Sequence, residues 1–206
     1  MAKKKEKDMK LVLASTSKYR RKILDLAFLK HEAVASDFEE KSNKKNNPKE
    51  YVKELALGKA KNIEDKFENS IILGMDTVVV AQGEVLEKPK DIEDAKREIR
   101  LCSEHTAKVI TGVAIINQLN GQTLNFACTS KISFRKIPEK EIDFYIKNEK
   151  GALYSAGFVL ETVMSNFIKK IEGSYYNILG APVEAIYEKL SEWGYCLDDF
   201  QEEQNL

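Results

Sequence analysis

The 206-residue chain has few of the residues that usually mark metal centres, disulfide frameworks and nucleophilic catalysis. Its two histidines, His31 and His105, are isolated, and no Gly-x-Ser-x-Gly segment accompanies them, so a catalytic triad has no support. The three cysteines, Cys102, Cys128 and Cys196, lie far apart without the spacing of metal ligands. We therefore expect reduced, buried thiols in a reducing compartment and no zinc site.

Excess charge of one sign and long apolar runs are also missing. Lysine plus arginine and aspartate plus glutamate both total 33, so the chain has no global field to attract nucleic acid or an anionic membrane. No apolar run approaches the ~18 residues of a membrane helix. Residues 1–9 are expected to be a flexible basic tail rather than a signal peptide or an anchor. These features predict a cytoplasmic protein without nucleic-acid or membrane partners.

What the chain does have is enough hydrophobic residues, 43%, for a packed core in one domain or two closely joined lobes. Strand-like runs are predicted at 11–14, 71–80, 85–86, 108–119, 122–134 and 167–171. Helices are predicted after the turn 15–17 and from Pro48, Asp91, Pro138 and Pro182 onward. Residues 173–177 are expected to form a loop, and 194–206 a peripheral acidic tail. The alternation with inserted hairpins predicts an α/β or α+β fold with a mixed sheet.

A candidate anion site lies where the first strand leads into the first helix. Ser15 and Ser17 form a hydroxyl-rich turn, and Arg20 follows in the first turn of the helix. Backbone N–H groups, the positive end of the helix dipole and a guanidinium together favour phosphate. The glycine pattern of a P-loop is absent. An ordinary serine-capped helix with solvated arginines is the alternative interpretation.

Several charged residues stand in positions that need an explanation. Asp76 interrupts the most strand-like run of the chain, and a carboxylate there should be paired, metal-bound or exposed at a site. Lys59 lies in the apolar stripe of a helix, where it either extends its ammonium to water or meets an anion. Lys88 precedes Pro89, which restricts its backbone, but it could also be a surface lysine. The acidic run 37–40 could supply oxygen ligands to magnesium or simply be solvated.

Taken in order, these segments resemble the signatures of the Maf family. The matching segments are 13–24, 37–40, 59–61, 73–78, 83–91, 111–113 and 171–177, followed by Gly180 and Pro182. The ordered set is far more specific than any one of its members. The resemblance implies one catalytic domain over residues 10–193, with two lobes around an elongated mixed sheet flanked by helices, as in Maf and ITPase folds.

The resemblance also implies a homodimer that splits a nucleoside triphosphate, bound between the lobes, into monophosphate and pyrophosphate with Mg²⁺, Mn²⁺ or Co²⁺. Water would attack the α-phosphorus. The residues carried over for the triphosphate are Ser15, Ser17, Arg20, Lys59 and Lys88, the two lysines being catalytic. Glu40 and Asp76 would form the acidic, metal-binding centre, with Asp76 as proton acceptor or as metal ligand.

Three positions concern the choice of base. Tyr19 and Glu161 resemble a branch of the family associated with 7-methyl-GTP, whereas Thr77 resembles the branch that prefers pyrimidine nucleotides such as dTTP and UTP. Methylation makes the guanine ring cationic, so an aromatic face attracts it, and a carboxylate accepts its N–H groups. We expect a preference for 7-methyl-GTP, with dTTP or UTP as the alternative.

Two other functions compete with this hypothesis. The first is a house-cleaning pyrophosphatase for inosine or xanthosine triphosphate, whose signatures differ from those present here. The second is a nucleotide-binding regulator of septum formation, a cell-division role attached to the Maf family, for which hydrolysis would be incidental. The presence of Asp76, Lys59 and Lys88 favours catalysis.

Overall fold

A computed structural model describes residues 9–40, 46–149 and 159–201, so the predicted basic tail lies almost wholly outside the described residues. The strands are β1 (Lys10–Ala14), β2 (Glu32–Val34), β3 (Ser70–Ala81), β4 (Glu84–Leu86), β5 (Ala107–Asn117), β6 (Gln122–Phe134) and β7 (Ile168–Glu172). The helices are α1 (Lys18–Leu26), α2 (Pro48–Glu64), α3 (Ile92–Glu104), α4 (Glu139–Asn148), α5 (Tyr175–Ile178) and α6 (Val183–Glu192), with 3-10 helices η3 (Val163–Phe167) and η4 (Leu197–Phe200).

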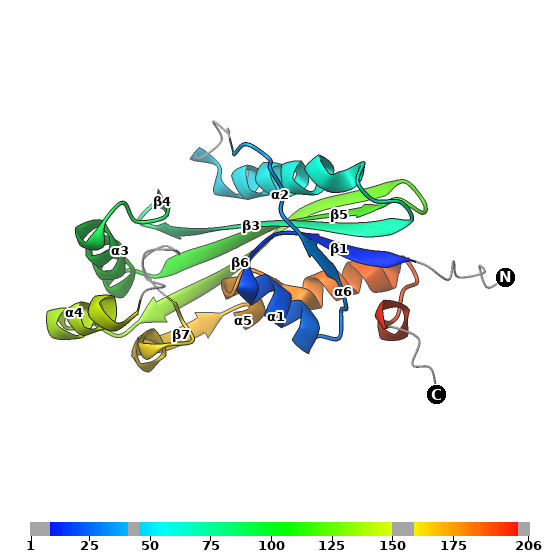
Figure 1. Ribbon diagram of the computed structural model, residues 1–206. Helices are drawn as coiled ribbons and strands as arrows, with labels where there is room; N and C mark the ends of the chain where they lie inside the picture. Colours follow the sequence, from blue (N-terminus) through cyan, green and yellow to red (C-terminus); the bar gives the residue numbers. More distant parts are fainter. Residues whose placement is uncertain (1–8, 41–45, 150–158, 202–206) are drawn as a thin grey trace.

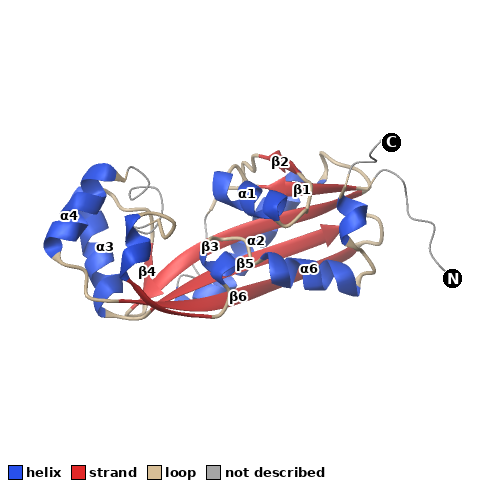
Figure 2. Cartoon of the chain, turned by 90° about the horizontal axis from the view of Figure 1, so that it is seen from below, coloured by secondary structure: helices blue, strands red, loops and turns tan. Residues whose placement is uncertain are grey.

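The strands form one elongated seven-stranded sheet with the order β2-β1-β3-β5-β6-β7, and β4 pairs with β3 beside this path. β1 runs parallel to β2 and β3, whereas β3, β4, β5, β6 and β7 pair antiparallel. The prediction of a mixed sheet is therefore confirmed. Figures 1 and 2 show the long strands β3, β5 and β6 running through the whole molecule.

The helices divide the molecule into two lobes. In the first lobe, α2 covers one face of the sheet and α1 and α6 cover the other (Figure 1). In the second lobe, α3 and α4 pack at the far end of the long strands, around a separate apolar cluster that includes Ile99, Ile132 and Tyr145. Because β3, β5 and β6 contribute side chains to both lobes, the sheet itself joins them.

Local sequence signals explain where most elements begin. The hydroxyl of Ser17 caps α1 by accepting from the backbone N–H of Arg20, and the carboxylate of Asp91 caps α3. Pro48 stands in the first turn of α2, although Asn47 makes no side-chain cap bond. Gly121 has φ +70°, as the predicted hairpin between β5 and β6 requires. The predicted helices and hairpin are confirmed.

One strand was missed and three expectations are wrong in part. β2 was not predicted, because it is a three-residue, mostly exposed edge strand. The expected loop at 173–177 contains the start of α5, whose N-terminus is capped by Ser174. The tail after residue 194 is not wholly peripheral, since η4 packs Phe200, 4% exposed, into the first lobe. Of the three thiols, Cys102 is buried, but Cys128 is half-buried and Cys196 is exposed.

None of the helices formed by residues 9–40, 46–149 and 159–201 combines the length and apolar character needed to cross a bilayer.

A buried carboxylate in the second lobe gives a prediction about stability. Glu98 on α3 is 2% exposed, and within the described residues its Oε2 atom has no hydrogen-bond partner. Burial raises the pKa of this carboxyl group to about 7, and the negative charge of Asp94 adds to the effect. The folded protein therefore holds this proton to a higher pH than the unfolded chain does.

We expect the free energy of unfolding to fall as the pH rises from about 4.5 to about 7 because of this group. Glu98→Gln, which carries no titrating proton, should lose this dependence and exceed the parent by on the order of 3 kcal/mol above neutral pH. Urea unfolding from pH 4 to 9 measures the difference, with Glu104→Gln, an exposed position on the same helix, as the control. Parallel curves for Glu98→Gln and the parent would contradict the prediction.

Candidate active site

The site begins at a gap in the sheet pairing of β3. On one side of β3, β1 pairs only up to Gly74, and β4 begins to pair only at Val79. The four residues between them therefore have no strand neighbour on that side among the described residues. Asp76 lies in this open stretch. A gap between two strands of a sheet is a place where ligands can approach backbone and side chains from the edge.

Two glycines bring α2 close to the sheet at this position. Gly112 on β5 is the cross-strand partner of Asp76, and Gly74 lies two residues before Asp76 on the same face. A Cβ atom on Gly112 would lie 2.2 Å from the backbone oxygen of Val52 on α2, and one on Gly74 would lie 2.1 Å from that of Ala56. The helix backbone thus occupies the space that larger residues would need.

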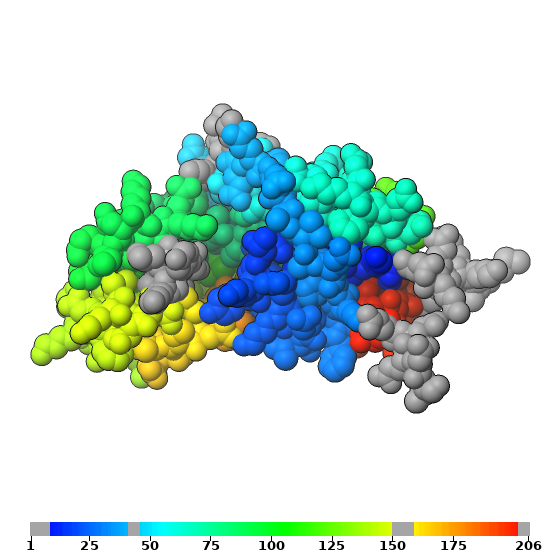
Figure 3. Space-filling view, in the orientation of Figure 1, coloured from blue at the N-terminus to red at the C-terminus, as the bar shows by residue number. Residues whose placement is uncertain are grey.

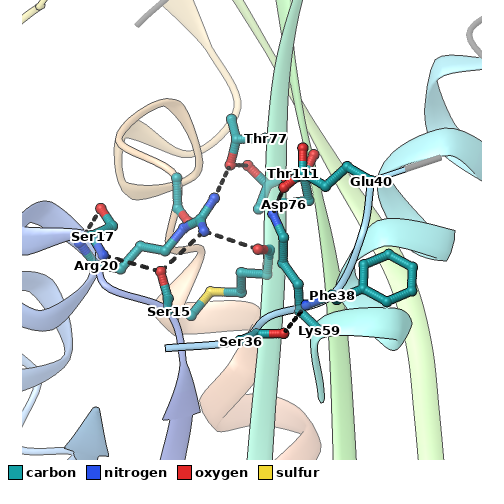
Figure 4. A network of polar contacts seen from close by, with 12 residues as sticks. Ser15, Ser17, Arg20, Ser36, Phe38, Glu40, Lys59, Asp76, Thr77 and Thr111 are labelled. Atoms are coloured by element: carbon teal, nitrogen blue, oxygen red, sulfur yellow. Dashed lines mark hydrogen bonds and ion pairs between the residues drawn. The ribbon is translucent and has the colours of Figure 1, made fainter. Parts of the chain in front are cut away.

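This close approach places Lys59 of α2 against the carboxylate of Asp76. The distance from Lys59 Nζ to Asp76 Oδ1 is 2.6 Å, and Lys59 Nζ also lies 2.7 Å from Glu40 Oε1 (Figure 4). The side chain of Lys59 is 15% exposed. Of the two interpretations of Lys59 in its apolar stripe, the structure supports the one in which it meets an anion.

Glu40 reaches the centre from a segment that is fastened to α2. The backbone N–H of Asp37 donates to Asn62 Oδ1 at 3.0 Å. The ring of Phe38 lies over Gly58, close enough to fill the space of a Cβ atom there. These contacts hold the chain along α2 on the way to Glu40, whose own side chain is 52% exposed. The acidic run 37–40 thus contributes one carboxylate to the centre.

The electrostatics of Asp76 favour a proton-accepting carboxylate. Asp76 is 8% exposed, and this burial raises its pKa. The nearby positive charges of Lys59 and Arg20 act in the opposite direction and favour the charged form. The same carboxylate is thus more basic than a surface aspartate while keeping a cationic partner.

The turn that carries Ser15 and Ser17 leads directly into the same centre. Ser15 Oγ accepts from the backbone N–H of Ser17 at 3.2 Å, and Ser17 Oγ accepts from that of Arg20 at 3.4 Å. The N-terminus of α1 with its two hydroxyls therefore faces the open edge of β3 (Figure 4). The turn thus combines two hydroxyls with the N-terminus of a helix, as anion-binding turns do.

Arg20 is more deeply engaged than the sequence alone indicated. Its guanidinium donates to the backbone oxygens of Gly180 (3.0 Å) and Met75 (2.9 Å) and to the hydroxyls of Ser15 (3.3 Å) and Thr77 (3.1 Å). Burial lowers its pKa, and the charges of Asp76 and Glu40 oppose this. Arginine stays charged regardless, so Arg20 supplies a fixed, half-buried cation near Asp76. Most of its donors are used within the protein.

These residues line one cavity of about 1160 Å³ that lies between the lobes. Its lining includes the turn 14–20, Glu40, Lys59, the β3 stretch 76–79, Lys88 and the segment 159–161. Within the described residues, no hydrogen bond or ion pair engages the ammonium of Lys88, which comes from the loop after β4. Figure 3 shows this side of the molecule, with the first lobe in blue beside the green and yellow second lobe.

The three residues expected to choose the base occupy different positions in the cavity. Tyr19 and Glu161 line it from α1 and from the segment before η3, and burial together with the charge of Glu161 raises the pKa of Tyr19. Glu161 also lies 3.9 Å from Lys22 Nζ. The hydroxyl of Thr77 instead takes part in hydrogen bonds with Arg20 and Thr111 inside the protein.

A divalent metal fits the carboxylates of this centre. Asp76 and Glu40 already share one cation, the ammonium of Lys59, so their oxygens converge. Magnesium and manganese commonly take one or two carboxylates and complete their coordination with phosphate oxygens and water. No set of three or more His, Cys, Asp or Glu side chains among the described residues forms a site made of protein ligands alone.

Sequence reasoning assigned no role to Gly74 or Gly112, although both lie in segments that carry the family resemblance. A physical signal was also present, because an isolated glycine in a strand-like run indicates close backbone approach.

Comparisons of the sequence with known proteins show the family of the chain. The family model described as Maf-like protein matches residues 10–193. A dTTP/UTP pyrophosphatase of Geobacillus sp. (strain WCH70) is 35% identical over 185 residues, covering 90% of this chain and 98% of that protein. Proteins with the same name from Clostridium botulinum (strain Alaska E43 / Type E3) and Syntrophus aciditrophicus (strain SB) are 35% and 33% identical, covering 89% and 90% of this chain and 99% and 90% of their own lengths.

Proposed function

Since the chain belongs to the Maf family and is a nucleoside triphosphate pyrophosphatase, we propose that it converts dTTP or UTP into the monophosphate and pyrophosphate at Asp76. The observation that carries the proposal is the convergence of a carboxylate pair, a buried lysine and an anion-binding turn on one cavity between the lobes. Phosphoryl chemistry depends mainly on such positioning and charge neutralisation.

The reaction breaks the bond between the α-phosphorus and the oxygen that bridges it to the β-phosphate. Water attacks the α-phosphorus, and Asp76 accepts the proton that the water loses, a task helped by its raised pKa. Pyrophosphate leaves with the electrons of the broken bond. Lys59 and Lys88 neutralise the charge that develops on the phosphates, and the turn at Ser15 and Ser17 orients them.

We further propose that Asp76 and Glu40 would hold a divalent metal ion, Mg²⁺, Mn²⁺ or Co²⁺, when the nucleotide binds, which is the alternative to the role of Asp76 as proton acceptor. Such an ion supplies positive charge to the phosphate oxygens and lowers the pKa of bound water. The two carboxylates would then share their negative charge between the ion and Lys59.

The relatives' names and Thr77 favour a pyrimidine nucleotide as the substrate. A second candidate, 7-methyl-GTP, is favoured by Tyr19 and Glu161, because both side chains line the cavity and the charge of Glu161 acts on the Tyr19 phenol. A cationic base would gain from both groups. The two candidates differ in how strongly they depend on the charge of Glu161.

A nucleotide panel tests the substrate proposal. With magnesium, we expect kcat/KM for dTTP and UTP to exceed that for 7-methyl-GTP, GTP and ITP by ~10-fold or more. The products should be monophosphate and pyrophosphate in equal amounts. Glu161→Gln, which removes the charge and keeps the shape, should leave dTTP turnover nearly unchanged.

Preferred turnover of 7-methyl-GTP that is lost in Glu161→Gln would replace the first candidate by the second. Release of orthophosphate instead of pyrophosphate, or no release from any nucleotide in the panel, would contradict the proposed reaction.

A further inference from the structure

A chain of hydrogen bonds, from partly to fully buried, runs behind the open stretch of β3, on the face opposite α2. Arg20 Nη2 lies 3.1 Å from Thr77 Oγ1, which lies 3.0 Å from Thr111 Oγ1 on β5, which in turn lies 3.1 Å from the backbone oxygen of Asn177. Thr111 and Asn177 are both 0% exposed. The chain joins two segments, 111–113 and 171–177, that the proposed reaction leaves without a role.

The direction of every bond in this chain is fixed by its two ends. A carbonyl oxygen only accepts, so the hydroxyl of Thr111 donates to Asn177 and must accept from Thr77. A guanidinium only donates, so Thr77 accepts from Arg20 while it donates to Thr111. Thr77 therefore has no hydroxyl proton left for a substrate.

At the other end of this series of hydrogen bonds, Asn177 is also fixed by hydrogen bonds. Asn177 Nδ2 donates to the backbone oxygen of Val109 at 3.1 Å and to Ser130 Oγ at 2.9 Å. Its backbone N–H donates to Ser174 Oγ, the cap of α5. The backbone oxygen of Gly180, three residues after Asn177, accepts from Arg20 Nε at 3.0 Å. The hydrogen bonds and the segment 177–180 therefore form a ring that returns to Arg20.

This ring holds both neighbours of Asp76. Arg20 donates to the backbone oxygen of Met75 on one side and to the hydroxyl of Thr77 on the other. These bonds lie in the stretch of β3 that lacks a strand partner on its open side. Thr111, the cross-strand partner of Thr77, fixes the hydroxyl that receives the second bond.

We propose that Thr111 is a positioning residue for catalysis, which acts by fixing Thr77 and Arg20 and through them the backbone at Asp76. This role rests on the proposed function. It also implies that Thr77 influences the reaction from inside the protein rather than through direct hydrogen-bond donation to the base.

The test compares two substitutions of Thr111. Thr111→Val keeps the shape but removes the hydroxyl, so Thr77 loses its acceptor and the Asn177 carbonyl its donor. We expect kcat for dTTP with magnesium to fall by ~10-fold or more while KM changes little, as loss of an orienting contact predicts. Thr111→Ser restores the hydroxyl and should recover most of kcat.

The matched control is Ser70→Ala on β3, the strand that pairs with the strand of Thr111. Ser70 is also 0% exposed, and its hydroxyl donates to the backbone oxygen of Glu68, remote from the ring. Ser70→Ala should lower the Tm about as much as Thr111→Val does, but it should not lower kcat. Hydrogen exchange of the 75–78 amides adds a readout that is independent of turnover, and it should become faster only in Thr111→Val.

The outcomes separate this inference from the proposed function. Unchanged kcat and unchanged exchange in Thr111→Val, with an active parent, would overturn the positioning role alone. An inactive parent would overturn the proposed function and with it the catalytic role of Thr111, and the exchange measurement would then test only whether Thr111 fixes the backbone at Asp76. Equal losses of kcat in Thr111→Ser and Thr111→Val would also contradict the positioning role, since the hydroxyl of residue 111 would then have no effect.

Discussion

Asp76→Asn is expected to lower kcat for pyrophosphate release by roughly 10³-fold, within the range found for removal of a positioned general base. Asparagine keeps the size of the side chain but cannot accept a proton from water. The fold should survive, because the substitution removes a buried negative charge and leaves Lys59 paired with Glu40 at 2.7 Å. Steady-state kinetics with dTTP and magnesium, together with a Tm, measure both effects.

The control for this prediction is Asp65→Asn, an exposed aspartate at the C-terminus of α2, which should behave like the parent. A metal titration separates the two roles open to Asp76. A proton acceptor predicts a loss that higher magnesium or manganese does not restore, whereas a metal ligand predicts a shift to higher metal concentrations with partial recovery. Activity of Asp76→Asn within ten-fold of the parent would exclude both roles.

The importance of Asp76 could be predicted because the free-energy cost of a carboxylate in an apolar strand is evident from the sequence. A carboxylate in an apolar strand must have a reason to be there, and the structure supplies Lys59 and Arg20 as nearby charges. Lys59 was ambiguous, since a long side chain in an apolar stripe can either reach water or meet an anion. Only the close approach of α2 to the sheet resolves this, and the glycines in the strands indicate that a backbone approaches without indicating which one.

The elements of the fold were predictable where caps and turns specify them. Ser17, Asp91 and the turn at Gly121 each determine their local backbone through contacts within a few residues. β2 and α5 were missed because three- and four-residue elements depend on pairing or packing with distant segments. The ring through Thr111 and Asn177 was out of reach for the same reason, since it joins residues 66 positions apart.

The second large effect concerns the glycine opposite Asp76. In Gly112→Ala, the new Cβ would lie 2.2 Å from the oxygen of Val52 and 2.7 Å from the backbone nitrogen of Lys53. Both atoms belong to the backbone of α2, so a rotamer change cannot relieve the clash. The helix must move away from the sheet. We expect the free energy of unfolding to fall by about 3 kcal/mol, at the upper end of the cost of overpacking.

The same displacement should reach the active centre, because Lys59 stands on the helix that moves and its bond to Asp76 spans only 2.6 Å. We therefore expect kcat to fall together with stability, although Gly112 is not among the residues that line the cavity. Gly121→Ala is the control: its backbone has φ +70° and open space around it, so alanine there adds strain of about 1 kcal/mol without displacing a helix.

Urea unfolding and steady-state turnover of both variants distinguish close packing from backbone strain as the reason for glycine at 112. Gly121→Ala should lose some stability and keep its kcat, whereas Gly112→Ala should lose both. If Gly112→Ala unfolded at the parent's urea concentration and turned over dTTP at the parent's rate, α2 would have to be free to move without disturbing Lys59. The ion pair with Asp76 would then depend on the reach of the lysine side chain and not on how closely α2 packs on the sheet.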